Sequence, residues 1–143
     1  RNLLELWKYY MMDVDEDAVV YLGTKEGTVP SEVIKDLEIA EKGDKLFDAN
    51  KHIESWPVKK HDHILIPAGT IHCSGKGSMV LEISATPYIF TFKLWDWGRL
   101  GMDGKPRPIN IEHGEKVIDW KRTTNWTKNN LVNRVDIVAK GDG

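Results

Sequence analysis

Residues 61–84 (HDHILIPAGTIHCSGKGSMVLEIS) constrain the fold of this chain more than any other segment. An apolar run at 64–66 meets a Pro-x-Gly turn at 67–69, and His72 follows before a second apolar run begins at Met79. Short apolar runs separated by Gly and Pro are typical of antiparallel β-structure. The pattern predicts strand, tight turn, histidine and strand, an arrangement that places an imidazole at the mouth of a small β-barrel.

Short apolar runs separated by turn residues recur along the chain. Strands are predicted at residues 18–22, 58–60, 64–67, 79–84 and 89–95, with a strand-like stretch at 135–139. Many short strands separated by turn residues favour a barrel or jelly roll over a parallel sheet.

Helical periodicity is confined to a few segments. Residues 28–42 are predicted to form a helix, because Pro30 and Ser31 supply start signals and Gly43 a stop signal, and the apolar residues share one face: Val33, Ile34, Leu37 and Ala40. A short helical stretch is predicted over 44–52, and another from Asn110 through Trp120. The fold predicted is mainly β with a small helical insertion and a short C-terminal helix.

Composition narrows the class of function. A chain of 143 residues suits one domain. Its net charge of −2 argues against nucleic-acid or membrane-surface partners. No apolar run approaches the roughly 20 residues that a membrane helix needs. The single cysteine, Cys73, cannot form an internal disulfide and suits a reducing compartment, so we expect a cytoplasmic protein.

His72 is the first candidate site residue. A neutral imidazole is the commonest metal ligand in proteins, and a turn after a strand fixes the direction of its ring. A divalent metal needs at least three protein ligands, however. On spacing alone, His72 is either a metal ligand or a polar residue in a turn.

Two charged residues interrupt apolar strands. Glu82 lies between Leu81 and Ile83, and Lys93 lies in the run 89–95. Burial of an unpaired charge is very costly, so each side chain faces either water or a polar barrel lumen that holds substrate. Cys73 is interpreted as a packing residue.

The loop at 98–108 carries three cations: Arg99, Lys105 and Arg107. Such a group suits a phosphate or a phosphosugar. The alternative is a solvated basic loop.

Taken in order, residues 8–27, 57–84, 91–99 (TFKLWDWGR), 103–113 (DGKPRPINIEH) and 116–120 (KVIDW) resemble the class I mannose-6-phosphate isomerase family of cupins, in its long bacterial branch. The resemblance implies a cupin jelly-roll barrel and a bound divalent metal, usually zinc. It also implies interconversion of mannose 6-phosphate and fructose 6-phosphate through a metal-stabilised enediolate, with a small sugar phosphate as partner.

The resemblance also assigns roles to residues. His72 falls on the last metal ligand of the family, and Lys93 and Arg99 fall on catalytic positions. Substrate-binding positions are matched by Glu82, Lys105 and Arg107.

Part of the family's metal site has no match in this chain. The family's upstream Q-x-H segment is absent, and Trp7 stands at the position of a glutamate ligand, which Glu5 can replace only if the chain slips by two residues. We therefore expect residues 1–7 and 8–143 not to be neighbours in the parent gene product. We expect residues 1–143 to form one cupin-like domain, in which 121–143 is a linker or the start of a further segment.

Two other functions stay open. The first is a non-catalytic, metal-free sugar-binding or regulatory cupin. The second is a different metal-dependent cupin chemistry, such as an oxygenase, which is disfavoured because those sites take two or three histidines from motifs absent here. Metal content separates the isomerase from the metal-free alternative.

Overall fold

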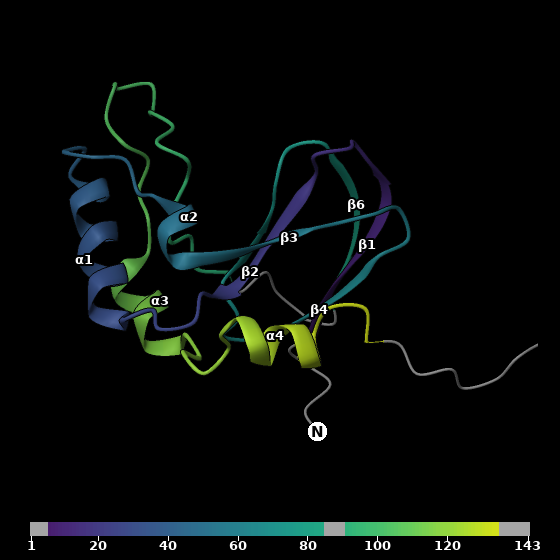
Figure 1. The fold of residues 1–143 in the computed structure, drawn as a ribbon. Helices are drawn as coiled ribbons and strands as arrows, with labels where there is room; N and C mark the ends of the chain where they lie inside the picture. The colour runs from purple at the N-terminus through teal and green to yellow at the C-terminus, as the bar shows by residue number, and fades with distance from the viewer. Residues whose placement is uncertain (1–5, 85–90, 135–143) are drawn as a thin grey trace, which may run out of the picture.

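The computed structural model describes residues 6–84 and 91–134, which form two antiparallel sheets and four helices (Figure 1). One sheet has the strand order β4-β1-β6, made of His63–Pro67, Leu6–Val14 and Ser78–Ser84. The other has the order β3-β2-β5, made of Ile53–Pro57, Val19–Thr24 and His72–Ser74. This mainly β, two-sheet architecture confirms the predicted fold class.

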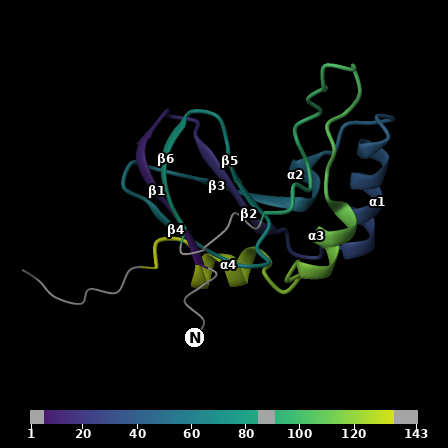
Figure 2. The same ribbon diagram turned by 180° about the vertical axis from the view of Figure 1, so that it is seen from behind.

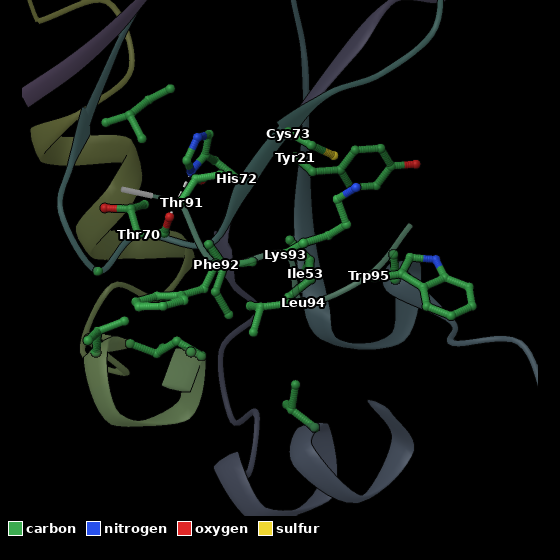
Figure 3. Close-up of a pocket in the computed structure, with 18 of the residues that line it drawn as sticks. Tyr21, Ile53, Thr70, His72, Cys73, Thr91, Phe92, Lys93, Leu94 and Trp95 are labelled. Carbon is green, nitrogen blue, oxygen red and sulfur yellow. Dashed lines mark hydrogen bonds between the residues drawn. The ribbon is translucent and has the colours of Figure 1, made fainter. Parts of the chain in front are cut away.

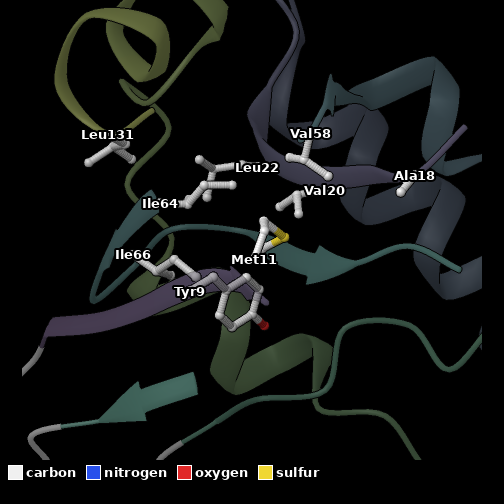
Figure 4. Close-up of a cluster of buried hydrophobic side chains, with 9 residues drawn as sticks. All are labelled: Tyr9, Met11, Ala18, Val20, Leu22, Val58, Ile64, Ile66 and Leu131. Carbon is white, nitrogen blue, oxygen red and sulfur yellow. The ribbon is translucent and has the colours of Figure 1, made fainter. Parts of the chain in front are cut away.

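The main core lies between the two sheets (Figure 4). Strands β1 and β4 contribute Tyr9, Met11, Ile64 and Ile66, while β2 contributes Val20 and Leu22 from the opposite side. Because side chains alternate between the two faces of a strand, Tyr9 and Met11 are buried whereas the neighbouring Met12 is exposed. The alternation therefore commits one face of each sheet to the core.

Helix α1 (Pro30–Glu41) confirms the helix predicted from periodicity. Proline stands in its first turn, where the missing N–H costs nothing, and the four apolar residues predicted to share a face are all buried. They pack with Ile111 of α3 (Ile111–Val117) in a second hydrophobic cluster. Figures 1 and 2 show α1, α2 (Ala49–His52) and α3 gathered at one end of the two sheets.

Strands predicted at 64–67 and 79–84 form as β4 and β6, but two other predicted strands are wrong. Residues 58–60 enter a turn instead of a strand: Lys59 N–H donates to the Asp62 carboxylate (2.7 Å), and His61 adopts a left-handed φ of 75°. A strand does form directly before these residues, as β3 (Ile53–Pro57). Residues 91–95 also form no strand, because the backbone of Lys93 pairs with Asn110; residues 89 and 90 lie outside the described ranges.

The helix boundaries also differ from prediction. Helix α2 occupies four residues of the predicted 44–52 stretch, and α3 ends at Val117 rather than Trp120. Helix α4 (Thr124–Asn130) forms where no element was predicted and packs against β2, while the following Leu131 enters the main core. The strand-like stretch at 135–139 lies outside the described residues.

Among the residues described, no helix has the length and apolar character required to cross a membrane.

Candidate functional site

A cavity of about 740 Å³ opens between the sheets and the helical end of the molecule. Its walls are mostly apolar. The polar groups in them come from β2, from residues 70–73 and from residues 91–93 (Figure 3): Tyr21, Thr70, His72, Cys73, Thr91 and Lys93. A large apolar cavity with a few convergent polar groups is the usual form of a small-molecule site. Two residues predicted from the sequence, His72 and Lys93, thus line one cavity although 21 positions separate them.

The imidazole of His72 has a defined hydrogen-bonding state. Its Nδ1 lies 2.8 Å from the carbonyl oxygen of Thr70. Because a carbonyl can only accept, Nδ1 carries the proton, which leaves Nε2 of the neutral ring free to bind a cation. Burial lowers the pKa of His72, while the bond to Thr70 and the charge of Glu82 act in the opposite direction. The neutral ring is therefore the favoured form.

The turn before His72 is tightly held. Gly69 has a φ of +80°, and a Cβ there would lie 2.6 Å from the Val117 carbonyl oxygen. The guanidinium of Arg122 donates to the carbonyl oxygens of Pro67 (2.7 Å) and Ala68, and to the hydroxyl of Thr70. Arg122 therefore fixes the turn that sets the direction of His72.

Sequence reasoning missed Arg122 because nothing in its local sequence marks it. The turn lies more than 50 residues before it in the chain, and only the fold brings the two together.

The fit of a metal ion to this site depends on its donor set. His72 has the free Nε2 that a metal ligand needs. However, the residues described here contain no group of three or more His, Cys, Asp or Glu side chains that could hold a metal. Glu5, the other predicted ligand, lies outside the described residues. Those residues therefore do not make a complete metal site.

Lys93 stands on the opposite wall of the cavity, and its side chain runs beside the ring of Tyr21 (Figure 3). Its backbone is held by Asn110: the Lys93 N–H donates to Asn110 Oδ1 (3.2 Å), and the Asn110 N–H donates to the Lys93 carbonyl (2.7 Å). Asn110 is the N-cap residue of α3, which begins at Ile111, but its side chain bonds to Lys93 instead of the helix.

The two predicted arginines do not line this cavity. Arg99 and Arg107 line a small adjoining hollow, where both approach the carboxylate of Asp96. The distance from a guanidinium nitrogen to an Asp96 carboxylate oxygen is 3.8 Å for Arg99 and 3.5 Å for Arg107. Lys105 does not line this hollow: it is exposed, and its backbone N–H donates to Asp103 (3.1 Å).

Glu82 lies on β6 opposite Tyr9, which is directed into the core. Its side chain is exposed and is not part of the cavity lining. Glu82 nevertheless acts on the site electrostatically. Burial of Tyr9 is the main cause of its raised pKa, and the negative charge of Glu82 raises that pKa further. The same charge favours protonation of His72.

An aromatic wall completes the cavity. The rings of Tyr21 and Trp97 lie 5.7 Å apart, and those of Phe47 and Trp95 lie 6.0 Å apart. Trp97 is 48% exposed and has a φ of 55°, which is uncommon for a bulky residue. Both tryptophans line the cavity, and Trp95 also packs against the second cluster.

Cys73 also lines the cavity, where burial raises its thiol pKa to about 11. Because the thiolate is the nucleophilic form, this favours the packing interpretation over a catalytic one.

The two-sheet fold with a histidine-bearing cavity at one end is that of a cupin. No family model matches the chain. The chain resembles the crystal structure of the mannose 6-phosphate isomerase from Bacillus subtilis with a TM-score of 0.62 and 22% identity, over 80% of this chain and 34% of that one.

Sequence comparison points to the same group of proteins. The chain is 32% identical over 114 residues to the probable mannose-6-phosphate isomerase GmuF of Bacillus subtilis, covering 80% of this chain and 33% of the relative. It is 28% identical over 123 residues to the mannose-6-phosphate isomerase of Streptococcus mutans, covering 86% and 35% respectively. The chain is a homologue of bacterial mannose-6-phosphate isomerases and spans about a third of their length.

Proposed function

We propose that this chain is the cupin part of an aldose–ketose isomerase that interconverts mannose 6-phosphate and fructose 6-phosphate. The observation that carries the proposal is the shared cavity of His72 and Lys93, in a chain homologous to mannose-6-phosphate isomerases. The chain spans about a third of the length of those relatives.

The reaction moves a hydrogen between two neighbouring carbons. A proton leaves C2 of the open-chain aldose and one returns to C1, while the carbonyl shifts from C1 to C2, so no co-reactant is consumed. The intermediate is an enediolate that carries negative charge on its oxygens. The ammonium group of Lys93 stands in the cavity wall and can donate hydrogen bonds to those oxygens, which stabilises the developing charge.

The substrate phosphate is assigned to the basic loop. Arg99 and Arg107 meet at Asp96 beside the cavity and carry the planar donor groups that suit phosphate oxygens. Lys105 is exposed on the same loop, and Glu82 stands outside the cavity lining; both stay predicted substrate-binding residues.

We propose zinc as the divalent metal of the isomerase, with His72 as one ligand through Nε2 and Glu5 as another. The chemistry that zinc would supply is polarisation of the substrate carbonyl. Among the described residues, no group of three or more His, Cys, Asp or Glu side chains could hold the metal. This observation favours the second candidate function, a metal-free cupin that binds a sugar phosphate without turning it over.

We further propose that residues 1–143 act as one domain, in the cytoplasm, with a small sugar phosphate as partner and neither nucleic acid nor membrane.

Two measurements on the 143-residue chain separate the two functions. The first is metal content by elemental analysis; the second is turnover of mannose 6-phosphate, followed by the appearance of fructose 6-phosphate. The isomerase requires stoichiometric metal and turnover that Lys93→Ala lowers at least tenfold. The matched control is Lys76→Ala, which removes an exposed lysine that is paired with Asp17 and is not part of the cavity lining.

Absence of both metal and turnover, together with calorimetric binding of mannose 6-phosphate, would establish the metal-free sugar-binding function instead.

A further inference from the structure

Asp96 is a nearly buried carboxylate that three cations surround. Its side chain is 12% exposed. Lys93 Nζ lies 3.5 Å from Oδ2, Arg107 3.5 Å from the same oxygen, and Arg99 3.8 Å from Oδ1. A carboxylate removed from water needs such partners, because an unpaired buried charge is costly. The position is therefore built to be charged and paired.

Asp96 also lies where the two segments of the loop, residues 93–100 and residues 105–107, are hydrogen-bonded to each other. Its backbone carbonyl accepts from the Arg99 N–H (3.0 Å), and the Arg107 N–H donates to the Arg99 carbonyl (3.2 Å). The isolated bridge between Leu100 and Pro106 joins the same segments further out. The Asp96 carboxylate thus links the segment that carries Lys93 to the segment that carries Arg107.

Asp96 and its two neighbours lie between two spaces. Trp97 lines the large cavity, Asp96 lines the small hollow beside it, and Trp95 borders both. Lys93 belongs to the large cavity, yet its ammonium group reaches Asp96. The ion pair therefore crosses from one space to the other and limits where the ammonium group can go.

We propose that Asp96 is a positioning residue that holds the ammonium group of Lys93 at the cavity wall and ties it to the two arginines. This inference rests on the proposed function, in which Lys93 contacts the reacting oxygens. Glu41 lines the same hollow, and even with its charge counted beside that of Asp96 the three cations leave a net positive charge for an anionic substrate. Asp96 acts through Lys93 and does not itself touch substrate.

The first test needs neither substrate nor turnover. Lysines of the chain are acetylated under limiting reagent, and the rate at each lysine is followed by peptide mass spectrometry. An ammonium group held by a carboxylate is less available to the reagent, so Asp96→Asn should raise the rate at Lys93 several-fold. The matched control, Asp103→Asn, removes an exposed carboxylate of the same loop and should leave that rate unchanged. An unchanged rate in Asp96→Asn overturns the proposal.

The second test measures the link to catalysis with a double-mutant cycle. Misplacement of a catalytic group costs on the order of 10- to 100-fold in rate. Asp96→Asn should lower kcat for mannose 6-phosphate by that factor, and Asp96→Glu should restore part of it. In a Lys93→Ala background, Asp96→Asn should cost less than about threefold, because its effect passes through Lys93. An equal loss in both backgrounds overturns the proposal.

A binding measurement distinguishes positioning from a general loss of structure. Inorganic phosphate, titrated by calorimetry, should bind Asp96→Asn at least as tightly as the unmodified chain, since a competing negative charge is gone. A loss of phosphate binding together with a loss of the thermal transition indicates a purely structural role and overturns the proposal. If acetylation at Lys93 responds as expected but no variant turns over mannose 6-phosphate, the proposed function fails while the positioning of Lys93 by Asp96 stands.

Discussion

The two walls of the cavity are built by different forces. The wall that carries His72 belongs to the β-sheets, where apolar side chains from both sheets are packed out of water. The wall that carries Lys93 belongs to a segment without strand structure, held by ion pairs to Asp96 and by hydrogen bonds to Asn110. The buried apolar core holds the His72 wall rigidly, whereas the position of the Lys93 side chain depends on a few polar contacts that a single substitution can change. The first wall should therefore respond to mutation through stability, and the second through activity.

The largest expected effect comes from the core between the sheets that carry the His72 wall. Ile64 on β4 is fully buried in the main core. Truncation of such a residue removes buried apolar surface and leaves a cavity, so Ile64→Ala should lower the free energy of unfolding by about 2–5 kcal/mol. The measurement is urea denaturation followed by circular dichroism. Ile83→Ala, at an exposed position on β6, serves as the control and should cost under about 1 kcal/mol.

The next effect concerns the turn before His72. Gly69→Ala forces a Cβ into the Val117 carbonyl at a left-handed φ, and should cost about 2–4 kcal/mol in the free energy of unfolding. Gly104→Ala is the matched control, since Gly104 has a φ of +73° but open space around it. That variant should show only the backbone strain, about 1–2 kcal/mol. An equal loss of unfolding free energy in the two variants would mean that the turn at Gly69 can move to make room for the added Cβ.

A pH titration sharpens the role of His72. Burial lowers its pKa from the ordinary value of 6.5, so the unfolded chain binds a proton before the folded chain does. The stabilisation is therefore complete above pH 6.5 and is lost as the pH falls below that value toward the lowered pKa. Thermal melts between pH 7.5 and 5 should show a smaller loss of stability for His72→Gln than for the unmodified chain.

His63 provides the comparison for this titration, because burial lowers its pKa as well. The double variant of His63 and His72 should show the weakest pH dependence. A slope unchanged by His72→Gln would contradict the assignment of a neutral ring in the cavity wall.

The smallest effect on stability is expected at the loop wall. Trp97→Gly removes a half-exposed ring but also relieves the left-handed φ of 55°, and the two effects largely offset each other. The free energy of unfolding should change by less than about 1 kcal/mol. The affinity for mannose 6-phosphate, measured by calorimetry, should nevertheless fall, because Trp97 and Tyr21 form the aromatic wall. Trp97→Phe should retain most of that affinity.

Local sequence signals predicted the elements whose formation depends on nearby residues. The face of α1 follows from the spacing of its apolar residues, and the strands on either side of His72 follow from alternation and turn residues. The same signals failed at 91–95, where an apolar run reads as a strand but the backbone of Lys93 pairs with Asn110. A hydrogen-bonding partner 17 residues away cannot be detected from the pattern of a short stretch of sequence.

The sequence by itself determined the mainly β fold class, the helix α1, and the candidates His72 and Lys93, because periodicity, turn chemistry and family resemblance all act through residue identity. Only the tertiary structure decided that these two side chains share a cavity, that Arg122 fixes the turn beside His72, and that Asp96 gathers Lys93, Arg99 and Arg107. The physical reason is distance along the chain. Ion pairs and hydrogen bonds between remote residues depend on how the sheets and loops pack, and packing is a property of the whole fold.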